Sequence, residues 1–129
     1  MTQRLSLTAL LVRDYDEAIS FYVEKLGFTL TSDADLGGGK RWVVVQPAGG
    51  GAGILLAQPS NDAQAARIGD QTGKRVFLIL ETSDFAGDHA RMLTAGVRFL
   101  EEPRHEPYGV VAVFEDLYGN RWDLIEPKT

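Results

Sequence analysis

The feature of this sequence that most constrains its fold is a pattern of elements that occurs twice. Its first copy begins with a strand-like apolar run at residues 5–12. Asp14 follows as a helix N-cap candidate, with Glu17 three positions later as in a capping box. The helical spacing of apolar residues then ends at Gly27, because glycine readily adopts the positive φ that terminates a helix.

The second copy begins seventy residues later and keeps the same order. Residues 75–82 are strand-like, Asp84 is the N-cap candidate, and the helical pattern ends at Gly96. Asp14 to Gly27 is 13 steps and Asp84 to Gly96 is 12, so the two helices match to within one residue. The stripes expected to face the core are Ala18, Ile19, Tyr22 and Leu26 in the first helix, and Phe85, His89, Met92 and Leu93 in the second.

Three further strands are expected after each helix. In the first half they are residues 29–32, 41–46 and 53–57, and in the second half they are residues 98–101, 110–115 and 121–126. The sequence therefore predicts one domain with two βαβββ repeats, at about 4–58 and about 74–127. Residues 59–73 read as the linker between them, with a short helix at 62–67.

This order of elements predicts an α+β fold in which two tandem βαβββ repeats form a curved mixed sheet, a half barrel. One helix per repeat shields two or three strands on one face of the sheet, so the opposite face must cover something else. Residues 43–45 and 54–56 are apolar at both parities of their strands, which fits a sheet with two apolar faces. We therefore expect a concave ligand cavity on the face without helices.

Composition excludes several classes of protein. The 129 residues contain no cysteine, which rules out disulfides, thiolate metal sites and cysteine nucleophiles. A formal net charge of −5 argues against nucleic acid as a partner. There is no apolar run long enough to span a membrane and no signal-peptide pattern, so a cytoplasmic protein without a membrane partner is predicted. No cofactor is expected.

The residues around the repeats resemble those of the vicinal oxygen chelate superfamily, which includes glyoxalase I, the bleomycin resistance proteins and the extradiol dioxygenases. In the first half, residues 12–14 lead to residues 18–22 and then to 25–28 (KLGF). In the second half, residues 114–120 (FEDLYGN) and the strand 121–126 (RWDLIE) look like the D-x-x-G-N-x-x-E-L ending of the superfamily. The resemblance covers nearly the whole chain and implies the fold more strongly than any activity.

The resemblance also implies where a metal would be held. In metal-dependent members, four side chains on the first and last strands of the two halves bind one divalent ion. The corresponding positions here are Leu7, Leu55, Phe77 (or Val76 with a register slip of one) and Asp123. Of these only Asp123 can bind a metal, because leucine and phenylalanine cannot replace imidazole or carboxylate ligands. The resemblance thus implies the state of the bleomycin resistance proteins, which keep the fold without the metal.

Asp123 is the most informative candidate for chemistry. In a metal-free cavity it is a general base or an anchor for a cationic group. Alternatively, it is neutralised by an arginine, and the candidates are Arg121, Arg41 and Arg104. Its neighbour Trp122 points to the opposite face of the strand by alternation and is expected in the core.

The segment at residues 102–109 is read as a loop fixed by two prolines at the rim of the cavity. Arg104 could meet an anionic group, His105 could act near neutral pH, and Tyr108 could stack on a ligand or form a hydrogen bond. The alternative is a solvated connection in which Arg104 and Glu106 pair with neighbours. Elsewhere, His89 is expected to be a half-buried packing residue.

Taken together, these observations predict a metal-independent small-molecule binding protein that acts as a homodimer and sequesters a drug or metabolite. The residues expected to contact the ligand are Leu7, Trp42, Leu55, Phe77, Arg104, Tyr108 and Asp123, although the face on which Trp42 lies stays open. The alternative is a lyase, isomerase or dioxygenase-type enzyme. It would use a non-standard metal site made from Asp123, Glu126, His105 and Glu81, or metal-free acid–base catalysis by Asp123 and Tyr108.

Overall fold

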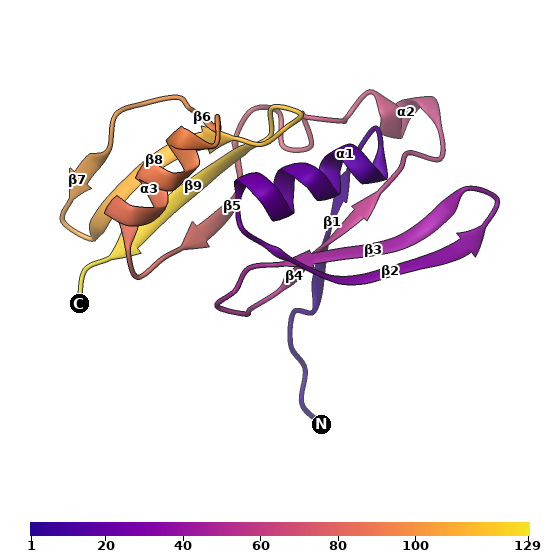
Figure 1. The fold of residues 1–129 in the computed structure, drawn as a ribbon, viewed down its shortest axis with the longest axis horizontal. Coiled ribbons are helices and arrows are strands. Elements are labelled where there is room, and N and C mark those ends of the chain that lie inside the picture. Colours follow the sequence, from indigo (N-terminus) through magenta and orange to yellow (C-terminus); the bar gives the residue numbers. More distant parts are fainter. The chain divides into compact units, whose positions relative to one another are not determined.

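A computed structural model describes all residues, 1–129. The chain forms two compact units, Met1–Ile68 and Gly69–Thr129. Each unit contains one mixed β-sheet and one longer helical segment (Figure 1). Neither sheet closes into a barrel, because each keeps two edge strands. This is the α+β architecture with tandem repeats that the sequence predicts.

The first unit contains a four-stranded sheet with the strand order β1-β4-β3-β2. β1 pairs with β4 in parallel, and the other neighbours are antiparallel. Its elements are β1 (Leu7–Leu11), α1 (Tyr15–Ser20), a π-helical turn (Phe21–Lys25), β2 (Thr29–Gly37), β3 (Lys40–Gln46), β4 (Gly53–Ala57) and α2 (Asp62–Ala65).

The helical segment of the first unit begins where the capping pattern predicts. The Asp14 carboxylate accepts the backbone N–H of Glu17 at 2.8 Å, and Gly27 follows the segment with a φ of 79°. The α-helix itself is shorter than predicted, because the chain continues from Ser20 as a π-helical turn. Ala18 and Tyr22 from these two parts are both buried.

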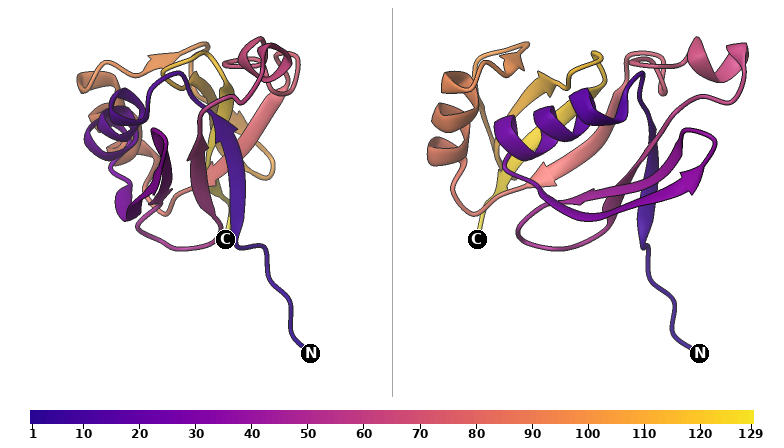
Figure 2. Two further views of the ribbon diagram at one scale, coloured as in Figure 1. Left: turned by 90° about the vertical axis from the view of Figure 1, so that its right-hand side faces the viewer. Right: turned by 45° about the vertical axis from the view of Figure 1, so that its right-hand side comes forward.

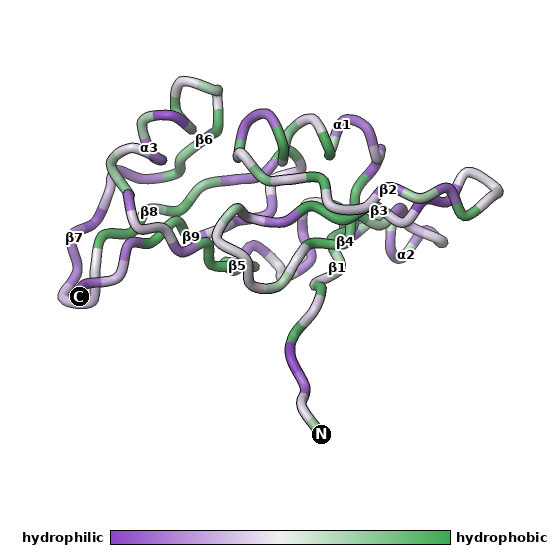
Figure 3. The backbone as a smooth tube through the Cα atoms, turned by 60° about the horizontal axis from the view of Figure 1, so that its bottom comes forward, coloured by the Kyte–Doolittle hydropathy of each residue, from purple (hydrophilic) through white to green (hydrophobic).

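The two faces of the first sheet differ. Figure 2 shows α1 on one side of the sheet, where Leu10, Val43 and Leu56 are fully buried. Side chains on neighbouring positions of each strand point to the other side. We call this other side the first helix-free face; it carries Leu7, Ala9, Trp42, Val44 and Leu55. Figure 3 shows apolar residues along β1, β3 and β4.

The second unit repeats this plan. Its sheet has the order β5-β9-β8-β6, and β7 also pairs with β8. As in the first unit, the first strand pairs in parallel with the last, β5 with β9. Its elements are β5 (Val76–Glu81), α3 (Phe85–Thr94), β6 (Arg98–Phe99), β7 (Arg104–Glu106), β8 (Gly109–Glu115) and β9 (Arg121–Pro127).

Aromatic residues fill the core of the second unit. Phe114 and Trp122 pair across β8 and β9, with ring centroids 5.8 Å apart. Trp122 is only 2% exposed, as alternation predicts. His89 of α3 is half-buried between the rings of Phe85 and Phe99, so it packs as expected. The opposite side of this sheet, the second helix-free face, carries Ile79, Arg104, Val111, Val113 and Asp123.

Besides the shorter α1, other local predictions are wrong, including the ends of α2 at Ala65 and of β6 at Phe99. β2 extends to Gly37, well beyond residue 32, because its polar half pairs with β3 in a long hairpin. Leu93 is exposed, since it lies about 100° around α3 from the buried Met92. The segment 102–109 is not a loop throughout, because Arg104–Glu106 pairs with β8 as the strand β7. No helix of the structure is both long and apolar enough to cross a membrane.

Candidate functional site

The first helix-free face is apolar at Leu7 and Leu55, two of the positions that the resemblance to the superfamily assigns to metal ligands. β-Sheet pairing places Ala9 opposite Leu55, and Leu7 lies two residues before Ala9 on the same face. A Cβ atom added to Gly53 would lie 3.1 Å from both the Leu7 and the Val44 side chains. Leu7, Val44 and Leu55 therefore form a continuous apolar surface without a charged group.

Trp42 belongs to this same face. It pairs with Ala34 across the β2–β3 hairpin, and it lies two residues before Val44, which pairs with Leu55. This register settles the direction that the sequence leaves open. The Trp42 side chain is 42% exposed, so part of the indole ring is accessible to solvent.

The second unit has the same arrangement with one irregularity. Ile79 lies opposite Asp123, and Phe77 precedes Ile79 by two residues, as Leu7 precedes Ala9 in the first unit. However, a register shift between Val76 and Leu78 leaves Phe77 without a Cα partner in β9. Phe77 is half-buried, and Ile79 is 66% exposed.

Asp123 is a half-buried carboxylate that forms no hydrogen bond or ion pair in the structure. Burial raises the pKa of Asp123 above its ordinary value, since the charged form loses hydration. The Arg104 guanidinium lowers this pKa and the Glu101 carboxylate raises it, and both effects are smaller than that of burial. None of the three arginines proposed from the sequence forms an ion pair with Asp123.

Arg104 is occupied by other groups. Its Nε atom donates a hydrogen bond to Glu101 at 2.8 Å, and its Nη1 atom lies 3.9 Å from Glu106. Hydrogen bonds with Glu101 and with the exposed Tyr108 raise the pKa of Arg104. Arg104 therefore pairs with nearby carboxylates, as the alternative of a solvated connection expects. This arginine lies on the same face as Asp123 without neutralising it directly.

Glu101 is the site residue that the sequence analysis missed. Its carboxylate accepts hydrogen bonds from the Arg104 guanidinium and from the backbone N–H of Val113. Val113 is the cross-strand partner of Asp123, so Glu101 brings a second negative charge near Asp123. The three-residue spacing of Glu101 and Arg104 is a weak signal for an ion pair, and the bond to Val113 has no signal in the sequence.

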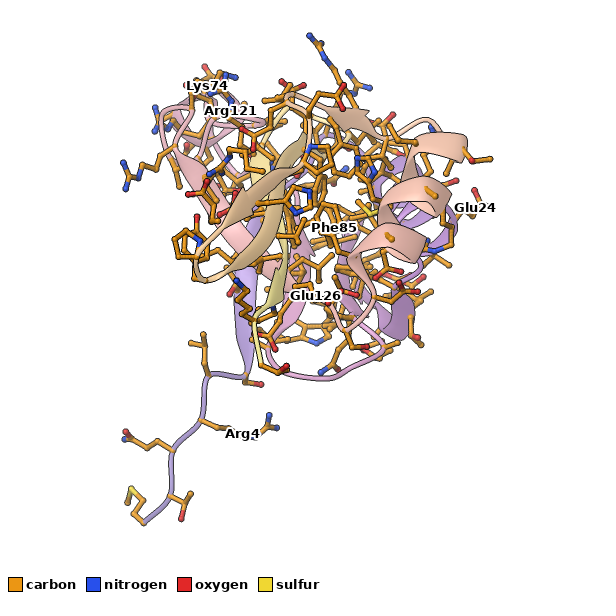
Figure 4. All side chains as sticks on the ribbon, turned by 90° about the vertical axis from the view of Figure 1, so that its left-hand side faces the viewer. Arg4, Glu24, Lys74, Phe85, Arg121 and Glu126 are labelled. Carbon is orange, nitrogen blue, oxygen red and sulfur yellow. The ribbon has the colours of Figure 1, made fainter.

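The residues of the structure do not fit a metal ion. No group of three or more histidine, cysteine, aspartate or glutamate side chains lies close enough together to hold one. In the alternative set, Glu126 and His105 both pair with Val110, whereas Asp123 and Glu81 lie on the opposite face of the sheet. The Glu126 carboxylate also accepts the backbone N–H of Phe85 at 2.7 Å, and both residues are labelled in Figure 4.

Comparisons with known proteins agree with this architecture. Residues 4–124 match the family model of the Glyoxalase/Bleomycin resistance protein/Dioxygenase superfamily. An uncharacterized protein of Shewanella frigidimarina (strain NCIMB 400) is 52% identical over 128 residues, which cover 98% of this chain and 95% of that protein. The crystal structure of UcmS2 is similar with a TM-score of 0.83 and 34% identity, covering 97% of this chain and 98% of that one.

A further similar structure is that of TnmS3, an antibiotic binding protein from Streptomyces sp. CB03234. It has a TM-score of 0.82 and 31% identity, and the match covers 98% of each chain. The match of the family model spans nearly all of both repeats. The chain therefore belongs to the glyoxalase/bleomycin resistance protein/dioxygenase superfamily.

Proposed function

We propose that this protein is a metal-independent small-molecule binding protein that sequesters a drug or metabolite. The observation that carries this proposal is the chemistry of the four positions that hold a divalent ion in metal-dependent members. Leu7, Leu55 and Phe77 offer no donor atom, and Asp123 alone cannot retain an ion against water. Apolar side chains at these positions suit contact with an organic molecule.

The comparison with TnmS3 supports the same function. That protein is an antibiotic binding protein, and it matches this chain in fold over nearly the full length of both. Fold similarity alone does not determine function in a superfamily with many activities. The similarity supports ligand binding here because the residues at the metal positions are themselves unsuited to metal chemistry.

The side chains of each helix-free face indicate the kind of chemical group that this face suits. Trp42 presents a partly exposed indole ring beside an uncharged apolar surface, which suits a planar or aromatic group. Asp123 is a carboxylate that has lost part of its hydration without gaining a partner. A protonated amine or a hydroxyl group of a ligand would supply that partner.

Tryptophan fluorescence tests this proposal, because Trp42 is 42% exposed and Trp122 is only 2% exposed. The probe is 9-aminoacridine, a planar aromatic cation, and bleomycin serves as a second probe. We expect saturable quenching of the tryptophan emission that is unchanged by EDTA and is lost in Trp42→Phe. The buried Trp122 remains in that variant as an internal reference.

Two outcomes would contradict the proposal. Absence of saturable binding for both probes would remove the support for small-molecule binding through Trp42. Elemental analysis that finds about one iron, nickel, zinc or manganese ion per chain, together with a higher melting temperature on metal addition, would contradict metal independence. Bound metal must raise the melting temperature if it binds the folded protein alone, so this result has a definite sign.

A second candidate function follows from Asp123 itself. A half-buried carboxylate with a raised pKa and no partner is suited to accept a proton, and the Tyr108 hydroxyl group lies near Arg104 on the same unit. An acid–base enzyme would convert its ligand, whereas a sequestering protein returns it unchanged. Mass spectrometry of 9-aminoacridine and bleomycin recovered after incubation distinguishes the two functions for these probes.

A further inference from the structure

The hairpin of β2 and β3 continues beyond the rest of the first sheet. β4 pairs with β3 only at Val43, Val44 and Val45, whereas β2 and β3 stay paired up to Gly37 and Lys40. We call residues 34–42 the distal arm; Figure 1 shows it extending to one side of the unit. A two-stranded ribbon is marginally stable without further support, so other contacts must hold the distal arm in place.

The two faces of the distal arm differ in chemistry. Trp42 and its partner Ala34 lie on one face, which continues the first helix-free face. Arg41 and its partner Asp35 lie on the other face, which is the side of α1. An open depression of about 380 Å³ on that side is lined by Asp33, Asp35, residues 37–39 and Arg41.

Arg41 joins the hairpin to α1 through several contacts. Its Nε and Nη2 atoms donate to the two carboxylate oxygens of Asp33 at 3.1 and 2.8 Å, and its Nη1 atom donates to Asp16 at 3.0 Å. The guanidinium carbon lies 5.1 Å from the centre of the Tyr15 ring. The Arg41 backbone N–H also donates to the Tyr15 hydroxyl oxygen at 3.2 Å. The Arg41 guanidinium holds the pKa of Asp33 below its usual range, as a hydrogen-bonded pair should.

We propose that Arg41 is a positioning residue that fixes the distal arm to α1 and so holds the neighbouring Trp42 indole in its ligand-binding position. The ligand part of this inference rests on the proposed binding function. Tyr15 is buried and Asp16 lies in the first turn of α1, so both anchor points belong to a supported element. The arm has no comparable anchor on the face of Trp42. A bidentate guanidinium pair also fixes orientation better than a single point charge does.

Amide hydrogen exchange tests the positioning role without any ligand. Arg41→Gln removes the contacts to Asp33 and Asp16, and we expect the amides of the distal arm to exchange about tenfold faster. The matched control is Arg13→Gln, which removes a 2.8 Å ion pair between Arg13 and Glu17 of the same helix. We expect the control to leave the exchange of the distal arm unchanged.

A double-mutant cycle with 9-aminoacridine tests the consequence for binding, measured from the fluorescence of the probe. Removal of the indole in Trp42→Ala should weaken binding about fivefold. Arg41→Gln should weaken it by a similar factor, and the double variant should be no weaker than Trp42→Ala alone. Arg41→Lys should recover part of the affinity, because lysine keeps the charge without the bidentate geometry.

The two readouts separate the possible failures. Unchanged exchange in Arg41→Gln overturns the positioning role, whatever the probe does. Faster exchange with additive effects of the two substitutions on affinity overturns the link from Arg41 to Trp42 and leaves ligand binding in place. Faster exchange without probe binding to any variant contradicts the proposed function, and with it the role of Trp42 in this inference, while the anchoring by Arg41 stands.

Discussion

Asp123 is the one ionisable side chain among the four positions that the resemblance to the superfamily assigns to metal ligands. The three positions assigned with it are apolar, namely Leu7, Leu55 and Phe77. Two neighbouring charges act on Asp123 in opposite directions, those of Arg104 and Glu101, and burial dominates both. The charged form is therefore disfavoured in the folded protein.

This residue predicts a pH dependence of stability. The folded-state pKa of Asp123 lies above the ordinary value of 3.8, so the folded protein holds this proton more tightly than the unfolded chain does. The contribution of Asp123 to stability is therefore largest below pH 3.8 and is lost as the pH rises through the folded-state pKa. Asp123→Asn should melt roughly 2 °C higher at pH 7. The gain should disappear near pH 3.5.

Thermal denaturation at both pH values measures this effect, with Glu102→Gln as the control. Glu102 is an exposed carboxylate in the same unit, so its loss changes the net charge equally without changing the site. A melting temperature of Asp123→Asn equal to or below that of the parent at pH 7 would show that the charged Asp123 carboxylate does not destabilise the folded protein.

For single residues, the sequence predicts burial better than it predicts hydrogen-bonding and ion-pair partners. The core position of Trp122 and the half-buried packing of His89 follow from strand alternation and helix spacing, which are local. The missing partner of Asp123 could not be predicted, because Arg104 on the same face is engaged by Glu101, and their three-residue spacing is only a weak signal for an ion pair. Likewise, the pairing of Arg41 with Asp33 and Asp16 joins residues from three elements.

Among the elements, the helices begin where their capping residues are. The Asp84 carboxylate accepts the backbone N–H of Gly87 at 3.1 Å at the start of α3, and Asp14 does the same for Glu17 before α1. These contacts span three residues, so the sequence can predict them. By contrast, β7 lies between Pro103 and Pro107, whose residue type favours a loop, and it exists only through its pairing with β8.

The cap of α3 gives a prediction for stability. Asp84→Ala removes the acceptor for the Gly87 N–H and should lower the free energy of unfolding by about 1 kcal/mol. Urea denaturation measures the change, and Glu102→Ala is the control because it lies outside the helices. Phe85 keeps its hydrogen bond to Glu126 in the variant, so the helix should still form. Equal losses in the two variants would mean that the cap adds nothing.

For the whole molecule, we expect a homodimer. Each sheet of the chain has a face without a helix, and Ile79 on the second helix-free face is 66% exposed. Exposed apolar side chains on a sheet face favour association with a second copy. Light scattering at micromolar concentration should give twice the 14.1 kDa of one chain. Ile79→Glu should shift the protein towards the monomer.

Leu93→Glu provides the control, because Leu93 is also exposed but lies on α3. This variant should remain a dimer. A parent protein that stays at 14.1 kDa would contradict the dimer, and equal dissociation by both substitutions would contradict the choice of the sheet face.

For the whole molecule, the sequence predicts the superfamily and the fold well, but it does not predict the ligand. The repeated pattern and the D-x-x-G-N ending predict the superfamily and its α+β fold, because they extend over most of the chain. The ligand is beyond this pattern, since one fold of this kind supports many unrelated activities. The side chains on the helix-free faces come from separate strands and carry no shared motif.

The difference between the two copies of the βαβββ plan has an evolutionary consequence. One copy presents Trp42 and aliphatic neighbours, while the other presents Asp123 within a set of ionisable groups. Because the copies share a backbone plan but not these side chains, mutations in one half need not disturb the other. Substitutions confined to one half of the gene can thus change the chemistry of one helix-free face and leave the side chains of the other as they are.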